Sequence, residues 1–270
     1  MIKICHTPDA DDAFMFYALE TGKISHDLNI EFCVDDIQTL NKKLFENNID
    51  VSAASVYASF LLKNYSIMRV GGSFGKGYGP VIVTKNMEKY DENRIIAIPG
   101  RLTTSYIIYK LFYRFKGEIE IRFDKIIDEI LAGHADYGLL IHEGQEVYKK
   151  YNLKLFSSLY DEWEKATGFK ILPLGINVIR NDLNYEIKNK IYNLIKKSVE
   201  YSLNNVEEAL DFAMKYSRDN SREIIKKFAL KYVNDLTVDM GDEGINSIKK
   251  VYEMAKEKNL ISGGRISFFP

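Results

Sequence analysis

His142 is the residue of this sequence best suited to acid–base chemistry. It is one of four histidines, and it directly follows the strand-like run Tyr137–Ile141. An imidazole titrates at about pH 6.5, so it can take up and return a proton near neutral pH. Two alternatives stay open. A histidine in this place can simply satisfy backbone groups at a strand end, and His6 also ends a strand-like run and competes for the role. His26 and His134 are expected in surface turns.

A second group of residues has the chemistry to bind an anion. Thr103, Thr104 and Ser105 follow a short apolar run and stand where a helix is expected to begin. Free backbone N–H groups at a helix start, together with hydroxyl side chains, suit the oxygens of a carboxylate or a phosphate. Helix capping by Thr103 or Thr104 is the structural alternative. The two roles are compatible, because a cap leaves other donors free.

Two further patterns resemble a metal site and a phosphate-binding loop, but both have simpler explanations. Asp9, Asp11 and Asp12 could be metal ligands, but a turn followed by capping of a helix over Ala13–Thr21, with Asp11 and Asp12 as cap candidates, explains them. No two histidines have the spacing of metal ligands, so no metal site is predicted. The stretch over 71–80 reads GGSFGKGYGP. It precedes a strand-like run and lacks the GK[ST] ending of a phosphate loop, so a hinge or a close approach to a ligand is the better interpretation.

The elements around these residues alternate between strand-like and helix-like patterns. Such alternation predicts βαβ units and a largely parallel sheet. Open α/β sheets bind ligands at the carboxyl ends of their strands, and Pro8, Ser52–Ser55, Gly100–Thr104 and His142 fall at such ends. From Tyr185 onward the pattern is mostly amphipathic helix. The predicted strands are Ile2–Cys5, Asn29–Val34, Asp50–Ala54, Val81–Thr84, Ile95–Ile98, Glu118–Phe123, Tyr137–Ile141 and Leu172–Ile179.

The domain organisation follows from the lack of a Pro- or Ser-rich linker in the sequence. Two lobes would have to be joined by crossing strands, and Val81–Thr84 and Leu174–Ile179 are the candidates. The predicted fold class is therefore α/β with two lobes. Residues 1–84 and 176–270 are expected to form a discontinuous first lobe that includes the C-terminal helices. Residues 85–175 are expected to form an inserted second lobe that carries the candidate histidine.

Composition restricts the class of protein. The 270 residues have a formal net charge of −1, whereas a nucleic-acid-binding protein is expected to show a basic excess or stripe. No run approaches the roughly 20 apolar residues of a membrane helix. The first apolar stretch is interrupted by His6, Pro8 and aspartates, so no signal peptide is predicted. Cys5 and Cys33 are expected to be reduced, buried side chains, and the protein is expected in the cytoplasm. Monomer and homodimer both stay open.

Several motifs in register give the sequence a family resemblance. They are TPDADDAFMFYAL from Thr7, DIQTLNK from Asp36, GKGYGP ending at Pro80, IPGRLTTSY from Ile98, GLLIHEGQ around His142, PLGINVIR from Pro173 and YVNDLTVDMGDEG from Tyr232. Over nearly its whole length the chain resembles the 1,4-dihydroxy-6-naphthoate synthases of the futalosine route to menaquinone (the MqnD family).

The resemblance implies a fold like that of type II periplasmic binding proteins, with the ligand cleft between the lobes. It implies a lyase that converts a small carboxylate, cyclic dehypoxanthinyl futalosine, to 1,4-dihydroxy-6-naphthoate and a sugar-derived fragment without a cofactor. The family's histidine base falls on His142. Many relatives carry Cys-Pro-Asn-Asp at Asp9–Asp12, so the resemblance assigns these aspartates no role. The candidate substrate-binding residues, from the family's contacting loops and the adjacent helix cap, are Ser52, Ala53, Ala54, Ser55, Thr103, Thr104 and Ser105.

Three other functions are weighed against this one. The chorismate dehydratase of the same pathway shares the fold, but the GLLIHEG and YVND segments argue against it. A small-anion solute-binding protein without chemistry would be exported, and no export signal is predicted. An effector-sensing domain of a DNA-binding regulator would need a helix-turn-helix segment, whereas this chain begins directly with a strand.

Overall fold

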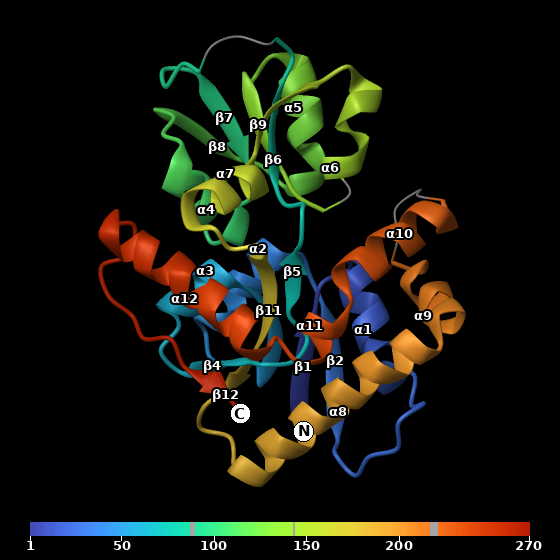
Figure 1. Cartoon of the computed structure of the whole chain (residues 1–270). Helices are drawn as coiled ribbons and strands as arrows, with labels where there is room; N and C mark the ends of the chain where they lie inside the picture. The colour runs from blue at the N-terminus through green and yellow to red at the C-terminus, as the bar shows by residue number, and fades with distance from the viewer. Residues whose placement is uncertain (87–89, 143, 217–220) are drawn as a thin grey trace.

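The computed structural model describes residues 1–86, 90–142, 144–216 and 221–270. The chain forms two lobes, each built on one β-sheet, and Figure 1 shows the smaller lobe above the larger one. The predicted two-lobed α/β architecture is therefore present.

The larger sheet has seven strands in the order β12-β4-β11-β3-β1-β2, and β5 pairs with β11 beside this path. β1 runs parallel to both β2 and β3. β11 runs antiparallel to β3, β4 and β5, so the sheet is mixed rather than wholly parallel. Its strands are β1 (Ile2–His6), β2 (Ile30–Val34), β3 (Val51–Ser55), β4 (Tyr65–Met68), β5 (Ser73–Gly75), β11 (Leu172–Arg180) and β12 (Phe268–Phe269).

The smaller sheet has five strands in the order β10-β6-β9-β7-β8. They are β6 (Val81–Thr84), β7 (Ile95–Ile98), β8 (Gly117–Glu120), β9 (Tyr137–Leu140) and β10 (Lys154–Ser158). Because β6 pairs with β9 and β10, it belongs to this sheet, whereas the whole of β11 belongs to the larger one. The division into lobes stays a proposal. Sheet membership favours a first boundary between β5 and β6 and a second between β10 and β11.

Helix α1 (Ala10–Glu20) lies inside the larger lobe, against α8 (Tyr185–Asn204), α9 (Val206–Ala213) and α10 (Arg222–Tyr232). Ten consecutive α1 residues, from Ala10 to Leu19, are buried. A helix with apolar residues on all sides is typical of such a surrounded position. α1 begins three residues before the predicted start, so Asp11 and Asp12 lie in its first turn. Their predicted role as helix caps was wrong, because Asp9 occupies the cap position.

The remaining helices cover the sheets and the contact between the lobes. They are α2 (Ile37–Leu44), α3 (Val56–Leu61), α4 (Thr104–Phe112), α5 (Ile126–Ala132), α6 (Gly144–Val147), α7 (Leu159–Thr167), α11 (Asp235–Val238) and α12 (Gly241–Glu257). α4 belongs to the smaller lobe by its position after β7, yet it contacts α3, α12 and β11 of the larger lobe.

One hydrophobic cluster extends through both lobes. It contains Ile96 and Leu139 from the smaller sheet together with Ala54 and Val178 from the larger sheet. Ile108 of α4 is fully buried in the same cluster. Burying a large aliphatic side chain stabilises the fold by about 1.5–3 kcal/mol, so the lobes are firmly joined along α4.

The oxidation state of the two cysteines differs from the prediction. Cys5 and Cys33 are register partners on β1 and β2, their Cα atoms are 4.5 Å apart, and they form a disulfide. The expectation of two reduced side chains was therefore wrong. In-register pairing of the two strands brings the side chains together, and no feature of the sequence alone gives that register. The cysteines consequently lend no support to the expected compartment.

Candidate active site

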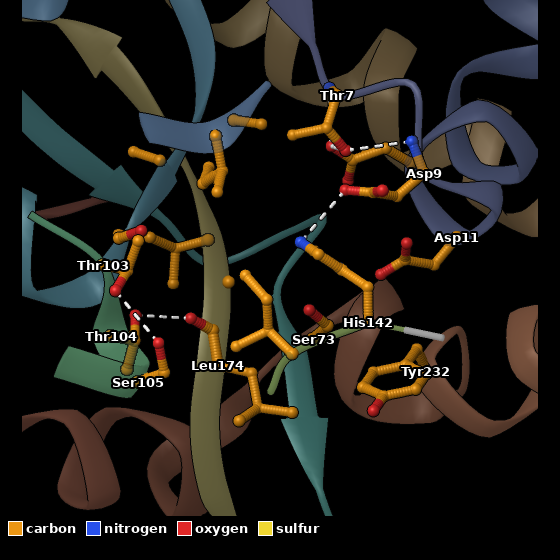
Figure 2. A pocket seen from close by; sticks show the side chains of 18 of the residues that line it. Thr7, Asp9, Asp11, Ser73, Thr103, Thr104, Ser105, His142, Leu174 and Tyr232 are labelled. Atoms are coloured by element: carbon orange, nitrogen blue, oxygen red, sulfur yellow. Dashed lines mark hydrogen bonds and ion pairs between the residues drawn. The ribbon is translucent and has the colours of Figure 1, made fainter. Parts of the chain in front are cut away.

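A cavity of 90 Å³ lies between the two lobes. Residues from the β1–α1 loop, the end of β3, the start of α4, the end of β9, β11 and α10 line it, and Figure 2 shows how their side chains face one another. Several of these segments follow the carboxyl ends of strands, where open α/β sheets bind ligands. The cavity therefore lies where the strand pattern placed a site.

His142 lies at this cavity, two residues after the end of β9. Its backbone is left-handed, with a φ of 51°, and the other non-glycine residues of the described chain with positive φ are all asparagines. A histidine in this region is uncommon and has an energetic cost. Its backbone N–H donates to the side-chain carbonyl of Gln145 at 3.0 Å, and the edge of its ring meets Phe123 at a centroid distance of 4.9 Å. These contacts fix the direction of the imidazole.

Asp9 faces the imidazole. Its Oδ2 lies 3.3 Å from Nε2 of His142, within the range of an ion pair (Figure 2). The two groups make no hydrogen bond, and within the described residues Nε2 has no hydrogen-bond partner. Asp9 is the N-cap residue of α1, yet its side chain makes no capping hydrogen bond. Its carboxylate is therefore directed to the cavity instead of the helix.

The neighbouring Asp12 anchors the β1–α1 loop. Its Oδ2 accepts hydrogen bonds from the backbone N–H of Thr7 at 2.9 Å and from the Thr7 hydroxyl at 2.8 Å. Thr7 and Asp12 are both buried. A carboxylate that accepts two buried donors holds the loop rigid, and it fixes Asp9 relative to His142.

His6, the competing acid–base candidate, lies outside the cavity lining. It is fully buried, with Nδ1 2.7 Å from the carbonyl oxygen of Thr7 and Nε2 3.3 Å from Oε2 of Glu20. Burial opposes protonation, but the hydrogen bond to Glu20 and the charge of Asp12 together raise the pKa of His6 above its usual value. Both ring nitrogens face acceptors, and one of these acceptors is Thr7 of the β1–α1 loop. His6 therefore stabilises this loop.

The anion-binding candidates Thr103, Thr104 and Ser105 all line the cavity. Thr103 is the N-cap of α4, and its hydroxyl accepts from the N–H of Tyr106 and donates to the carbonyl of Gly100. The Ser105 hydroxyl lies 2.9 Å from that of Thr103. The first N–H groups of a helix have no partner within the helix, so those of Thr104 and Ser105 are available to a ligand.

The Thr104 hydroxyl is already engaged in the structure. It donates to the carbonyl of Leu174 at 2.5 Å and accepts from the N–H of Val56 at 2.9 Å. Thr104 therefore links the start of α4 to β11 and to α3. Its backbone, rather than its side chain, is what it can offer to a ligand.

Three of the four candidates in the Ser52–Ser55 segment line the cavity, and one does not. Ala53, Ala54 and Ser55 line the cavity, whereas Ser52 is fully buried behind it and its hydroxyl donates to the carbonyl of Ala53. Ser55 is held by Asn41 of α2, whose side chain bonds both the N–H and the hydroxyl of Ser55 at 2.9 Å.

Sequence reasoning missed several lining residues. Tyr232 comes from the end of α10, and Ser73 and Leu174 come from β5 and β11. Only the YVND motif pointed near one of them. Asp11 was interpreted as a cap but lines the cavity, and burial and the charges of Asp12 and Asp9 raise its pKa well above the usual range.

Charge is distributed unevenly around the cavity. The aspartates stand on the β1–α1 side, and the N-terminus of α4, with its partial positive charge, stands on the opposite side (Figure 2). An anionic group on a ligand is consequently favoured at α4 and disfavoured at the aspartates. Within the described residues, no group of three or more His, Cys, Asp or Glu side chains is arranged to hold a metal ion.

Solved structures resemble this fold. A crystal structure of an Archaeoglobus fulgidus protein matches with a TM-score of 0.93 and 45% identity, covering 96% of this chain and 98% of that one. The ligand-binding component of an ABC-type import system from Staphylococcus aureus matches with a TM-score of 0.70 at 15% identity, over 97% and 93% of the two chains. The expected periplasmic-binding-protein-like fold is thus confirmed. No helix in the described ranges is long and apolar enough to span a membrane.

Sequence relatives identify the family. A 1,4-dihydroxy-6-naphthoate synthase from Thermus thermophilus is 31% identical over 261 residues, which cover 96% of this chain and 95% of the relative. A family model described as menaquinone biosynthesis matches residues 2–257. A match over nearly the whole length, to a family whose curated relatives are enzymes, shows that this chain belongs to the menaquinone biosynthesis family as one of its enzymes.

Proposed function

We propose that this enzyme is a 1,4-dihydroxy-6-naphthoate synthase, a carbon–carbon lyase that acts on cyclic dehypoxanthinyl futalosine with His142 as its acid–base residue. The observation that carries the proposal is the imidazole of His142, which lies at the interlobe cavity with Nε2 free of any hydrogen bond to the described residues. The name of the Thermus thermophilus relative supports the choice of reaction.

The proton transfer starts at Nε2. The imidazole of His142 takes a proton from the bound substrate, and the electron pair left behind expels the sugar-derived fragment as the ring system becomes aromatic. His142 then returns the proton to that fragment, so no co-reactant is consumed. The carboxylate of Asp9, 3.3 Å from Nε2, stabilises the imidazolium that exists between the two steps. Acid–base help of this kind contributes about 10²–10⁴-fold to the rate.

The cavity can orient the substrate through its uneven charge. The substrate carboxylate would lie at the start of α4, where the N–H groups of Thr104 and Ser105 can donate to it. The Ser105 hydroxyl can donate as well once it rotates away from Thr103. Asp9 and Asp12, across the cavity, repel the same carboxylate. This arrangement directs the uncharged, reacting part of the substrate toward His142.

The test replaces His142 by asparagine. Asparagine tolerates the left-handed backbone, as Asn47, Asn152 and Asn259 do in this chain, but it cannot act as a base. Turnover of cyclic dehypoxanthinyl futalosine, followed by mass spectrometry of the product, is expected to fall by about 10²–10⁴-fold, while binding of the substrate persists. His134→Asn is the matched control, because His134 is exposed and pairs with Glu129 away from the cavity. A His142→Asn enzyme with wild-type kcat would refute the assignment.

The same assay separates the rival functions. Wild-type protein that turns over chorismate and leaves the futalosine derivative unchanged would be a chorismate dehydratase. Tight binding of the futalosine derivative without product would indicate a solute-binding protein.

A further inference from the structure

Asp9, Asp11 and Asp12 occupy one turn of the chain, with exposed fractions of 5%, 8% and 9%. Two of the three carboxyl groups have clear partners. Asp9 faces His142, and Asp12 accepts two hydrogen bonds from Thr7. Asp11 is the third. Its carboxyl group lines the cavity, and in Figure 2 it is turned toward the side chain of His142.

The surroundings of Asp11 disfavour a negative charge. The largest effect is burial, which removes water from the carboxylate, and the charges of Asp12 and Asp9 add to it. The backbone N–H groups of Asp11 and Asp12 oppose these effects but do not cancel them, so the pKa of Asp11 lies well above its usual value. Carboxyl groups this close cannot all ionise readily, and the one without a dedicated partner is the one that keeps its proton.

The groups that face Asp11 from α10 and from the loop after β5 do not supply a cation. They are Tyr232 and Tyr78, and burial raises the pKa of both phenols, so both stay neutral. The ammonium group of Lys231 stands over the ring of Tyr78 at 4.2 Å and pairs with Glu146 at 2.7 Å. Among the described residues, no Lys or Arg forms an ion pair with Asp11.

Two histidines complete the surroundings. His142, at the end of β9, is paired with Asp9, and His6, at the end of β1, is directed toward Glu20. Neither ring is directed at the Asp11 carboxyl group. The Asp11 carboxyl group itself lines the cavity, so its O–H group can reach an acceptor on a bound ligand.

We propose that Asp11 acts as a neutral carboxylic acid that donates a hydrogen bond from its O–H group to an oxygen atom of the bound substrate. The proposal rests on the proposed function, because the oxygen in question gains negative charge while His142 removes the proton. A neutral acid stabilises that charge by donating to it, whereas an ionised Asp11 could only accept and would repel it. No bond to Asp11 forms or breaks in this role, and its proton stays on the carboxyl group.

The experiment compares Asp11→Asn with Asp11→Leu across pH, using cyclic dehypoxanthinyl futalosine. The amide of Asn keeps a neutral donor that cannot ionise. Leu has a similar size and no donor. We expect wild-type kcat/KM to fall on the alkaline side, as Asp11 ionises and Tyr78 and Tyr232 do not. Asp11→Asn is expected to lower kcat/KM by about tenfold or less and to lose this alkaline decline. Asp11→Leu is expected to lower kcat by about 10²–10³-fold at every pH.

Asp27→Asn is the matched control for the removal of one carboxylate. Asp27 is exposed and pairs with Lys190, so its variant should keep the wild-type pH profile. An alkaline decline that survives in Asp11→Asn, or equal activity of Asp11→Leu and Asp11→Asn, would overturn the proposal. Loss of all activity in Asp11→Asn would overturn it as well, because that result would make Asp11 a proton-transfer group.

A second measurement does not depend on turnover. Infrared difference spectra of wild type against Asp11→Asn at neutral pH should contain the carbonyl band of one protonated carboxyl group, which disappears at alkaline pH. Absence of this band would overturn the role of Asp11 even in an active enzyme. Conversely, wild-type protein that shows the band but produces no naphthoate would contradict the proposed function.

Discussion

The Thr104 hydroxyl gives a sharp test of which groups at the start of α4 serve the fold and which serve the ligand. Thr104 is buried, and its Oγ1 bonds the carbonyl of Leu174 and the N–H of Val56. Thr104→Val preserves the shape of the side chain and removes both hydrogen bonds. The variant leaves one buried acceptor and one buried donor without a partner.

The size of the effect follows from those two groups. An unsatisfied buried polar group costs about 1–3 kcal/mol, so the free energy of unfolding should fall by about 2–6 kcal/mol. In chains of this size each kcal/mol lowers Tm by about 2–4 °C. Thr104→Val should therefore lower Tm by at least about 4 °C. Thr104→Ser keeps the hydroxyl and should remain much closer to wild type.

The assay combines calorimetry with kinetics well below either Tm. Because the hydroxyl is engaged with the protein, we expect KM for the futalosine derivative to change by less than about threefold, which corresponds to under 1 kcal/mol. A wild-type Tm combined with a tenfold higher KM would show that the hydroxyl binds the substrate, and our interpretation of Thr104 would be refuted.

Two further predictions concern Ser105 and His6. Ser105→Ala should raise KM by about tenfold or more, since a hydrogen bond to a charged group contributes about 1.5–3 kcal/mol, and an unchanged KM in steady-state kinetics would place the carboxylate elsewhere. The raised pKa of His6 means that the folded state holds its proton more tightly than the unfolded state. Its contribution to stability is full below the unfolded pKa of 6.5 and is lost as the pH rises through the folded pKa. Melting curves from mildly acidic to alkaline pH should therefore decline less in His6→Gln than in wild type, and identical slopes would contradict this.

Strand periodicity was sufficient to find the general place of the site. His142 and the Thr103–Ser105 segment each follow a buried strand, and parallel strands bring such ends to one edge. The pattern could not show that Asp9 faces His142. Both positions fit a turn and a helix start equally well, and the two residues belong to different lobes, whose relative placement no local pattern encodes.

Other features depend on contacts that no local pattern encodes. Tyr232 reaches the cavity because α10 packs beside α1 more than 200 residues away in the chain, and its own helix looks like any amphipathic helix. The strands β5 and β12 have three and two residues, too few for an alternating pattern to be recognised. The disulfide between Cys5 and Cys33 requires the register of two parallel strands, which the whole sheet determines.

The hydrophobic cluster that runs through both lobes makes one side of the cleft harder to open than the other. The cavity of about 90 Å³ is small for a two-ring substrate, so we expect the lobes to separate when the substrate enters. Along α4 that separation would expose apolar side chains to water, whereas the opposite rim is joined by the solvent-accessible pair Lys231 and Glu146. We therefore expect the smaller lobe to rotate about a hinge at α4, so that the substrate enters past the rim formed by α6 and α10.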